Sequence, residues 1–146
     1  MKKLFIYYSY SGNGDVVADY LKKKGFELRK VIPKKSISNN KVLGILTGGF
    51  KASINYCDKL IDFDNDVSEY NEVYIGSPIW NSRFSSPINT VLKCLELENN
   101  KITFVFYSGS GTSPKATEKV KKTFPNAKII DLKEPKKNKE ELTKLK

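Results

Sequence analysis

Short apolar runs alternate with helical patterns along this chain, and that alternation restricts the possible folds more than any other feature. Residues 3–8 read KLFIYY, an almost unbroken apolar run that is typical of a strand buried on both faces. Residues 15–24 then place apolar side chains at helical spacing, and Gly25 follows where a helix C-terminal cap belongs. A strand covered on both faces needs helices on each side, so the pattern favours an α/β fold.

The same alternation continues toward the end of the chain. Further strands are predicted at 26–31, 72–76, 102–107 and 128–132, and helices at 86–95 and 114–123. Strands that are separated by helices pair in parallel. We therefore expect a doubly wound, five-stranded parallel sheet with helices on both faces.

Two stretches are less regular. Residues 42–60 are apolar at helical intervals but are interrupted by Gly48 and Gly49, which predicts a helix, a break, and then a loop or more helix. The tail from Lys133 to Lys146 holds six lysines and three glutamates, which predicts a short, frayed helix at most. A length of 146 residues suits one domain, so we expect a single domain over 1–146.

Three unusual loops leave the carboxyl ends of the predicted strands, at 9–14, 77–86 and 108–113. In doubly wound sheets, ligands bind beyond these ends. The first loop, SYSGNG, precedes a helix, and the unpaired amides and dipole of a helix N-terminus favour anions. Glycines let the backbone curl around a group of oxygens, while serines add donors. A plain turn with a serine cap is the alternative.

The loop at 77–86 contains Trp80, the only tryptophan, beside Ile79, which is a large apolar area for a loop. It indicates a cover for a flat ligand, or else a tryptophan folded into the core. Residues 108–113 read SGSGTS, whose amides and hydroxyls suit the polar edge of a ring system, or a glycine-rich connection to a helix cap. Together the three loops favour a mononucleotide with a large planar ring.

These pieces make the chain resemble the flavodoxin-like family of FMN proteins. The matching stretches are YYSYSGNG, GSPIWNSRFSSPINTVL and YSGSG, and LGILTGGFKAS is similar to a subgroup of small flavodoxins. The resemblance extends from Lys3 to about Leu132, and it implies the strand order 2-1-3-4-5 with FMN as cofactor. The implied residues around the FMN phosphate are Ser9, Tyr10, Ser11, Gly12, Asn13 and Gly14. Those along the isoalloxazine are Pro78, Ile79, Trp80, Asn81 and Ser82, and those at its pyrimidine edge are Ser108, Gly109, Ser110 and Gly111.

Asn81 suits the peptide beside the flavin N5, because asparagine tolerates left-handed backbone angles. Gly14 stands where the family usually has threonine, which removes one hydroxyl contact. The resemblance implies no catalytic residue, since the cofactor carries the chemistry.

An FMN electron carrier is therefore the expected function, and an FMN-dependent NAD(P)H:quinone-type reductase is the alternative. A nucleic-acid-binding module is disfavoured, because the chain lacks interleaved aromatic and basic residues. Neither Cys57 nor Cys94 shares a phosphate loop with an arginine, which excludes a tyrosine phosphatase.

The net charge is +10 at pH 7, whereas most flavodoxins are acidic. We therefore expect a redox partner protein with an acidic docking face, and Arg83 beside the ring; a solvated lysine surface is the alternative. The lack of histidine and of a CxxC pair excludes a zinc site and favours a reduced, cytoplasmic protein. No stretch approaches the ~20 apolar residues of a membrane span, so no membrane insertion is expected.

Overall fold

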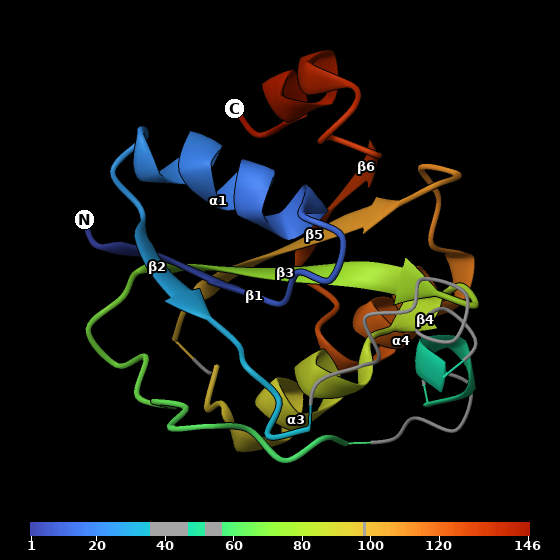
Figure 1. Ribbon diagram of the computed structural model, residues 1–146. Coiled ribbons are helices and arrows are strands. Elements are labelled where there is room, and N and C mark those ends of the chain that lie inside the picture. Colours follow the sequence, from blue (N-terminus) through green and yellow to red (C-terminus); the bar gives the residue numbers. More distant parts are fainter. Residues whose placement is uncertain (36–46, 52–56, 98) are drawn as a thin grey trace.

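The structure, a computed structural model, describes residues 1–35, 47–51, 57–97 and 99–146. Its central feature is a sheet in which the main strands run in parallel (Figure 1). These strands are β1 (Lys3–Tyr7), β2 (Glu27–Lys30), β3 (Glu72–Trp80), β5 (Lys101–Ser108) and β6 (Lys128–Lys133). Their order is β2-β1-β3-β5-β6, and the two-residue β4 (Arg83–Phe84) pairs antiparallel with β3. Numbered without β4, this is the predicted order 2-1-3-4-5, which is confirmed.

Helices cover both faces of the sheet, as predicted (Figure 1). They are α1 (Asn13–Lys22), α3 (Ser86–Cys94), α4 (Pro114–Thr123) and the 3-10 helix η1 (Lys139–Lys144). Strand β1 shows why two layers form. Leu4 and Ile6 pack in one buried cluster with residues of α3 and α4, while Phe5 and Tyr7 pack in another with residues of α1 and η1. The unbroken apolar run therefore supplies both cores.

The segment after β3 is more regular than predicted. Strand β3 continues from Glu72 to Trp80, so much of the expected loop at 77–86 is a β-hairpin closed by β4. Asn81 and Ser82, at its tip, have φ of +49° and +63°. Two consecutive positive φ values match the twist that two-residue hairpins need. Asn81 thus adopts the left-handed backbone that asparagine tolerates, while its place beside the flavin N5 stays a prediction.

The break predicted at Gly48 and Gly49 is wrong, because residues 47–51 are helical. Gly48 packs closely over the indole of Trp80: a Cβ there would lie 2.6 Å from Cε3 and 2.6 Å from Cζ3. Glycine in a helix costs about 1 kcal/mol relative to alanine, but at this position any larger residue would collide with the indole. The rest of the prediction for 42–60 lies largely outside the described residues.

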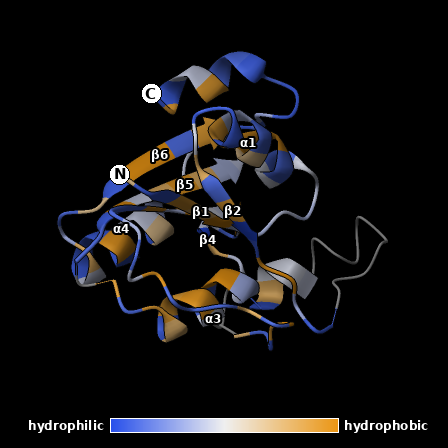
Figure 2. Cartoon of the chain, turned by 90° about the vertical axis from the view of Figure 1, so that its left-hand side faces the viewer, coloured by the Kyte–Doolittle hydropathy of each residue, from blue (hydrophilic) through white to orange (hydrophobic). Residues whose placement is uncertain are grey.

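The C-terminal tail packs against the fold. Leu142 and Leu145 are only 8% and 2% exposed and join the cluster beneath α1. Hydrophilic colour covers most of this segment in Figure 2, with small hydrophobic parts. The lysine-rich composition concealed two leucines that suffice to fix a short helix on the sheet. Among the described residues, no helix is long and apolar enough to cross a membrane.

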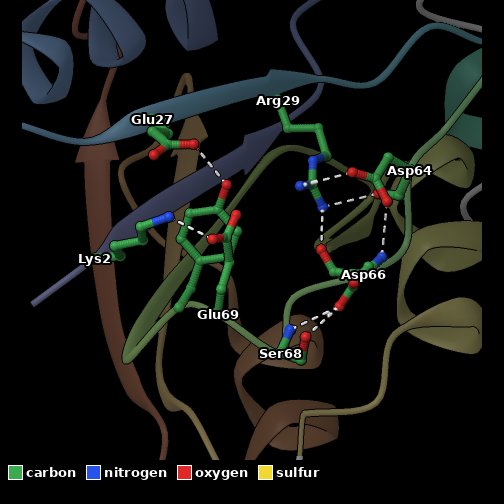
Figure 3. A network of polar contacts seen from close by, with 8 residues as sticks. Lys2, Glu27, Arg29, Asp64, Asp66, Ser68 and Glu69 are labelled. Carbon is green, nitrogen blue, oxygen red and sulfur yellow. Dashed lines mark hydrogen bonds and ion pairs between the residues drawn. The ribbon is translucent and has the colours of Figure 1, made fainter.

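A network of polar contacts ties residues 64–70 to the edge of the sheet (Figure 3). Arg29 of β2 donates to the backbone carbonyls of Asp64 and Asp66, at 2.9 Å each, and forms an ion pair with the Asp64 carboxylate at 3.1 Å. The hydroxyl of Tyr70 donates to Glu27 Oε2 at 2.6 Å. We call this set, completed by Lys2, Ser68 and Glu69, the Arg29 network.

Candidate functional site

The N-terminus of α1 lies at loop 9–14, at the carboxyl end of β1. Gly12 caps the helix with φ +94°, and its carbonyl accepts the first helical hydrogen bond, from the amide of Val16 at 3.2 Å. Ser9 Oγ accepts a bond from the amide of Asp15 at 3.3 Å. The amides of Asn13 and Gly14, in the first turn, have no carbonyl to bond within the helix. With the helix dipole they form an end of the helix that favours anions.

Gly14 is required by close packing behind this loop. A Cβ at Gly14 would lie 2.6 Å from the hydroxyl oxygen of Tyr107, 2.8 Å from Ser9 Cβ and 2.9 Å from the carbonyl oxygen of Tyr8. Tyr107 donates its hydroxyl to that same carbonyl, and burial raises the pKa of Tyr107 well above its ordinary value. Tyr107 therefore occupies the space that a threonine would need, which explains the departure at position 14.

The polar side chains of the loop contact the C-terminal tail. Asn13 Oδ1 accepts a bond from the backbone amide of Lys136 at 3.0 Å, and Asn13 Nδ2 donates to Ser11 Oγ at 3.3 Å. Lys136 Nζ donates to the carbonyl of Ser11 at 3.2 Å. Sequence reasoning missed Lys136, because only the fold brings it beside a loop more than one hundred residues earlier. Its sole sequence signal was the lysine content of the tail.

Trp80, on the hairpin, is half-buried among aromatic rings. It makes edge-on contacts with Tyr8 and Tyr10, with ring centroids 6.1 and 5.6 Å apart, and Gly48 packs over the indole. The contact with Tyr10 joins the hairpin to loop 9–14. Ile79 is half-buried beside Trp80 on the same strand, and Pro78 is buried. Stacking of Trp80 on a ring ligand stays a prediction.

The tip of the hairpin is anchored to α4. The carbonyl of Ser82 accepts a bond from the amide of Ala116 at 2.9 Å, and Ser82 Oγ accepts one from the amide of Lys115 at 3.3 Å. These bonds occupy amides at the start of α4. Asn81, the other residue of the tip, is exposed. The hairpin is thus held with its tip next to the helix that follows loop 108–113.

Loop 108–113 bonds mainly to itself. Ser108 Oγ accepts a bond from the amide of Gly111 at 2.9 Å, and Ser110 Oγ accepts one from the amide of Thr112 at 3.3 Å. Gly111 has φ +74°, and a Cβ there would lie 3.0 Å from Lys133 Cβ. Gly109 is exposed, with open space where a Cβ would stand. The hydroxyls therefore shape the loop, and its exposed backbone is available to a ligand.

The three loops lie at one edge of the sheet. They follow β1, β3 and β5, which are neighbours in the strand order and run in parallel, so their carboxyl ends meet (Figure 1). Tyr10 and Trp80 connect the first loop to the hairpin, and Ser82 connects the hairpin to α4. The fold thus brings the predicted site residues together. Their contacts with FMN stay a prediction.

Basic side chains surround a surface cavity of about 440 Å³ beside the hairpin. Arg83 lies on β4 opposite Trp80, and the other cations come from α4. Burial lowers the pKa of Lys119, whose Nζ lies 5.2 Å from the centroid of the Phe84 ring. The cations that line the cavity are Arg83, Lys115, Lys119 and Lys122, and we call them the α4 basic patch.

Comparison with known families identifies the kind of protein. A model of the flavodoxin family matches residues 2–145, which is nearly the whole chain. The chain belongs to the flavodoxin family. Among curated proteins, none is similar enough in sequence to match.

Solved structures share the flavodoxin fold at low sequence identity. A "putative flavoprotein" of Bacteroides eggerthii is 20% identical, with a TM-score of 0.72 over 94% of each chain. Another from Bacteroides uniformis is 19% identical, with a TM-score of 0.69 over 97% of each chain. A flavoprotein of Lactobacillus acidophilus in complex with FMN is 18% identical, with a TM-score of 0.69 over 95% of this chain and 97% of that one. At these identities the likeness concerns the fold.

Proposed function

We propose that this member of the flavodoxin family binds FMN across loop 9–14, the β3–β4 hairpin and loop 108–113, and that it carries electrons to or from a protein partner. The observation that carries the proposal is the anion-favouring N-terminus of α1 at the carboxyl edge of the sheet, with Gly14 packed so closely that no side chain fits. The similar flavoprotein of Lactobacillus acidophilus was solved in complex with FMN, which supports the choice of ligand.

The donors of loop 9–14 fit a phosphate. The amides of Asn13 and Gly14 lie in the first turn of α1, where they favour an anion, and Gly12 adds no side chain in front of them. The first-turn carboxylate, Asp15, forms an ion pair with Lys30 at 2.7 Å, which reduces its repulsion of an anion. These residues would hold the phosphate of FMN.

The hairpin and loop 108–113 fit a flat ring with one polar edge. Trp80 offers an aromatic ring, and Asn81 is an exposed residue with a left-handed backbone. Gly109 offers exposed backbone amide and carbonyl groups. When bound, FMN supplies chemistry for transfer of one or two electrons, while these residues orient the ring and limit its exposure to water.

Binding of FMN and riboflavin by the purified chain tests the cofactor. Both ligands are titrated against the chain, and flavin fluorescence is measured. Charge-assisted hydrogen bonds contribute roughly 1.5–3 kcal/mol each, so we expect FMN to bind at least about tenfold more tightly than riboflavin. Equal affinities would contradict a phosphate site at loop 9–14.

Emission of Trp80 tests the ring side of the proposed site, because it is the only tryptophan in the chain. We expect FMN to quench this emission and Trp80→Ala to weaken FMN binding, since stacked rings gain about 0.5–1.5 kcal/mol beyond burial. Unquenched emission in an FMN-saturated sample would place the flavin away from Trp80.

The α4 basic patch favours an electron carrier that docks on an acidic protein. It sets Arg83 and three lysines beside the hairpin, and Glu118 is the only carboxylate among the described residues that line the cavity. Glu118 forms an ion pair with Lys122 at 3.0 Å. Such a patch attracts an acidic face at long range, and salt weakens that attraction.

Turnover assays separate the carrier from the reductase alternative. We expect the FMN-loaded chain to oxidise neither NADH nor NADPH with a quinone as acceptor, but to accept electrons from an added flavoprotein reductase. The second reaction should slow as salt rises. Rapid quinone turnover with NAD(P)H alone would establish the reductase instead.

A further inference from the structure

Lys136 lies over the proposed phosphate site, although it belongs to the C-terminal tail. Its Nζ donates to the carbonyl of Ser11 at 3.2 Å and would lie 3.2 Å from a Cβ built on Gly12. Gly12 is the N-cap residue of α1. The ammonium therefore stands at the positive end of the helix dipole.

The backbone around Lys136 is held in place by its neighbours. The amide of Glu134 donates to the carbonyl of Ser108 at 3.0 Å, which joins the tail to loop 108–113. The amides of Lys137 and Asn138 bond back to the carbonyl of Glu134 at 2.8 and 2.9 Å, which closes a turn. The amide of Lys136 then donates to Asn13 Oδ1 at 3.0 Å. The fold thus presents Lys136 to loop 9–14 through bonds of the backbone.

The charge at this place is unbalanced. A cation near a helix N-terminus is repelled by the dipole. Among the residues that the structure describes, no carboxylate lies within ion-pair distance of Lys136 Nζ. Asp15, the carboxylate in the first turn, forms its ion pair with Lys30 at 2.7 Å. An anion at the first turn of α1 would relieve this repulsion.

We infer that Lys136 is a phosphate-binding residue, which closes over the FMN phosphate from the C-terminal tail and contributes an ammonium that the loop itself lacks. The inference rests on the proposed function. The C-terminal tail would then contribute to the affinity for the cofactor. Asn13 would be a positioning residue, because its side chain accepts a hydrogen bond from the backbone of Lys136 and so orients the tail.

Lys136→Gln is the direct test, and Lys137→Gln is its matched control. Lys137 is the next residue, its side chain is 74% exposed, and its ammonium forms an ion pair with Glu134. Lys136→Arg keeps the charge. FMN and riboflavin are titrated against wild type and all three variants at low and at high salt, and the melting temperature of each apo protein is measured.

Because a charge-assisted bond is lost, we expect Lys136→Gln to weaken FMN binding about tenfold at low salt, with riboflavin affinity unchanged. Its FMN affinity should also fall less steeply as salt rises, since one cation fewer faces the phosphate. Lys137→Gln should match wild type, and Lys136→Arg should bind FMN more tightly than Lys136→Gln. The ³¹P resonance of bound FMN should shift in Lys136→Gln and not in Lys137→Gln.

Equal FMN affinity in wild type and Lys136→Gln would overturn the inference and leave the proposed function intact. A wild-type chain that binds no FMN would instead overturn the proposed function. If Lys136→Gln lowers the apo melting temperature and weakens both ligands alike, Lys136 is a structural link of the tail and the inference fails.

Discussion

The Arg29 network and the N-terminus of α1 both join distant segments of the chain, but they balance charge in different ways. In the network, Arg29 meets two carbonyls and a carboxylate, and Lys2 pairs with Glu69 (Figure 3). At the helix N-terminus, Lys136 Nζ bonds to a carbonyl beside amides that already favour anions. The first region is satisfied by the chain itself, whereas we propose that an anion completes the second.

This difference separates structural charge from functional charge in a basic protein. The net charge of +10 alone suits both a binding surface and a solvated surface. The partners of each cation decide between them. Substitutions in the Arg29 network should therefore change stability and spare ligand binding, while substitution of Lys136 should change FMN binding first.

Gly14→Ala should have the largest effect. The new Cβ would lie 2.6–2.9 Å from atoms of Tyr107, Ser9 and Tyr8, so the loop or the tyrosine must shift. Overpacking of this kind costs about 1–3 kcal/mol, even though alanine favours a helix. We expect a loss of about 3 kcal/mol in unfolding free energy by urea denaturation, and a loss of FMN binding.

Gly109→Ala is the control for this substitution, because a Cβ at Gly109 has no atom within 4 Å. Its unfolding free energy should stay within about 0.5 kcal/mol of wild type, as for other surface substitutions. A Gly14→Ala chain with wild-type stability and FMN affinity would show that the residues behind loop 9–14 can shift to accept a Cβ at little cost.

Tyr107→Phe should have the next largest effect. It removes the buried hydroxyl that donates to the carbonyl of Tyr8 and leaves that carbonyl without this donor. A buried polar group without a partner costs about 1–3 kcal/mol, so we expect a loss of about 2 kcal/mol by urea denaturation. The variant should still bind FMN, because Tyr107 lies behind loop 9–14. Unchanged stability would indicate that water replaces the hydroxyl.

Most of the fold could be predicted from the sequence because the buried strands are apolar runs and the helices have regular spacing. Among the strands, the β3–β4 hairpin is the exception, because the sequence predicted a loop there. Strand β3 continues to Trp80 because Asn81 and Ser82 adopt positive φ in a tight turn, and the loop-like composition of residues 77–86 concealed that turn. Residues 47–51 are helical, and Gly48 lies against Trp80, a tertiary contact that no local pattern reveals.

The sequence predicted only those site residues that lie in loops directly after the strands. The loops at 9–14 and 108–113 follow strands directly, so their meeting at one edge follows from the parallel order. Lys136 and Tyr107 come from elsewhere, and only tertiary structure shows that Lys136 lies beside Ser11 and Gly12 and that Tyr107 lies behind Gly14. Sequence spacing carries no information about contacts of this kind.

Arg29→Met tests the Arg29 network, in which the chain itself pairs the charges. The side chain of Arg29 is 16% exposed and makes contacts with Asp64 and Asp66 that methionine cannot make. We expect a loss of about 1 kcal/mol in unfolding free energy, at the lower end for hydrogen bonds because the partners are solvated. FMN affinity should match wild type. Lys2→Met, which breaks an exposed ion pair, should cost less than about 0.5 kcal/mol. Weaker FMN binding in Arg29→Met would show that the Arg29 network and the N-terminus of α1 are energetically coupled.

The smallest effect concerns the pH dependence of Tyr70. Its hydrogen bond to Glu27 raises the pKa of Tyr70 to about 12 from an ordinary value of 10.0. A raised pKa in the folded state means that the neutral hydroxyl stabilises the fold below pH ~10, and that this stability is lost as pH rises through 12. Tyr70→Phe should therefore be less stable than wild type at neutral pH by a few tenths of a kcal/mol, and the gap should narrow between pH 10 and 12.

Urea denaturation of wild type, Tyr70→Phe, Glu27→Gln and the double variant over this range isolates that bond. The other tyrosines are present in all four proteins, so their titration cancels in the cycle. In the Glu27→Gln background, where no carboxylate holds the proton, the effect of Tyr70→Phe should vary less between pH 10 and 12. The FMN affinity of Tyr70→Phe should equal that of wild type at neutral pH, because the Arg29 network satisfies its charges without a ligand. If the coupling free energy between Tyr70 and Glu27 stays constant with pH, their contact stabilises the fold by packing and not through the hydrogen bond of the protonated hydroxyl.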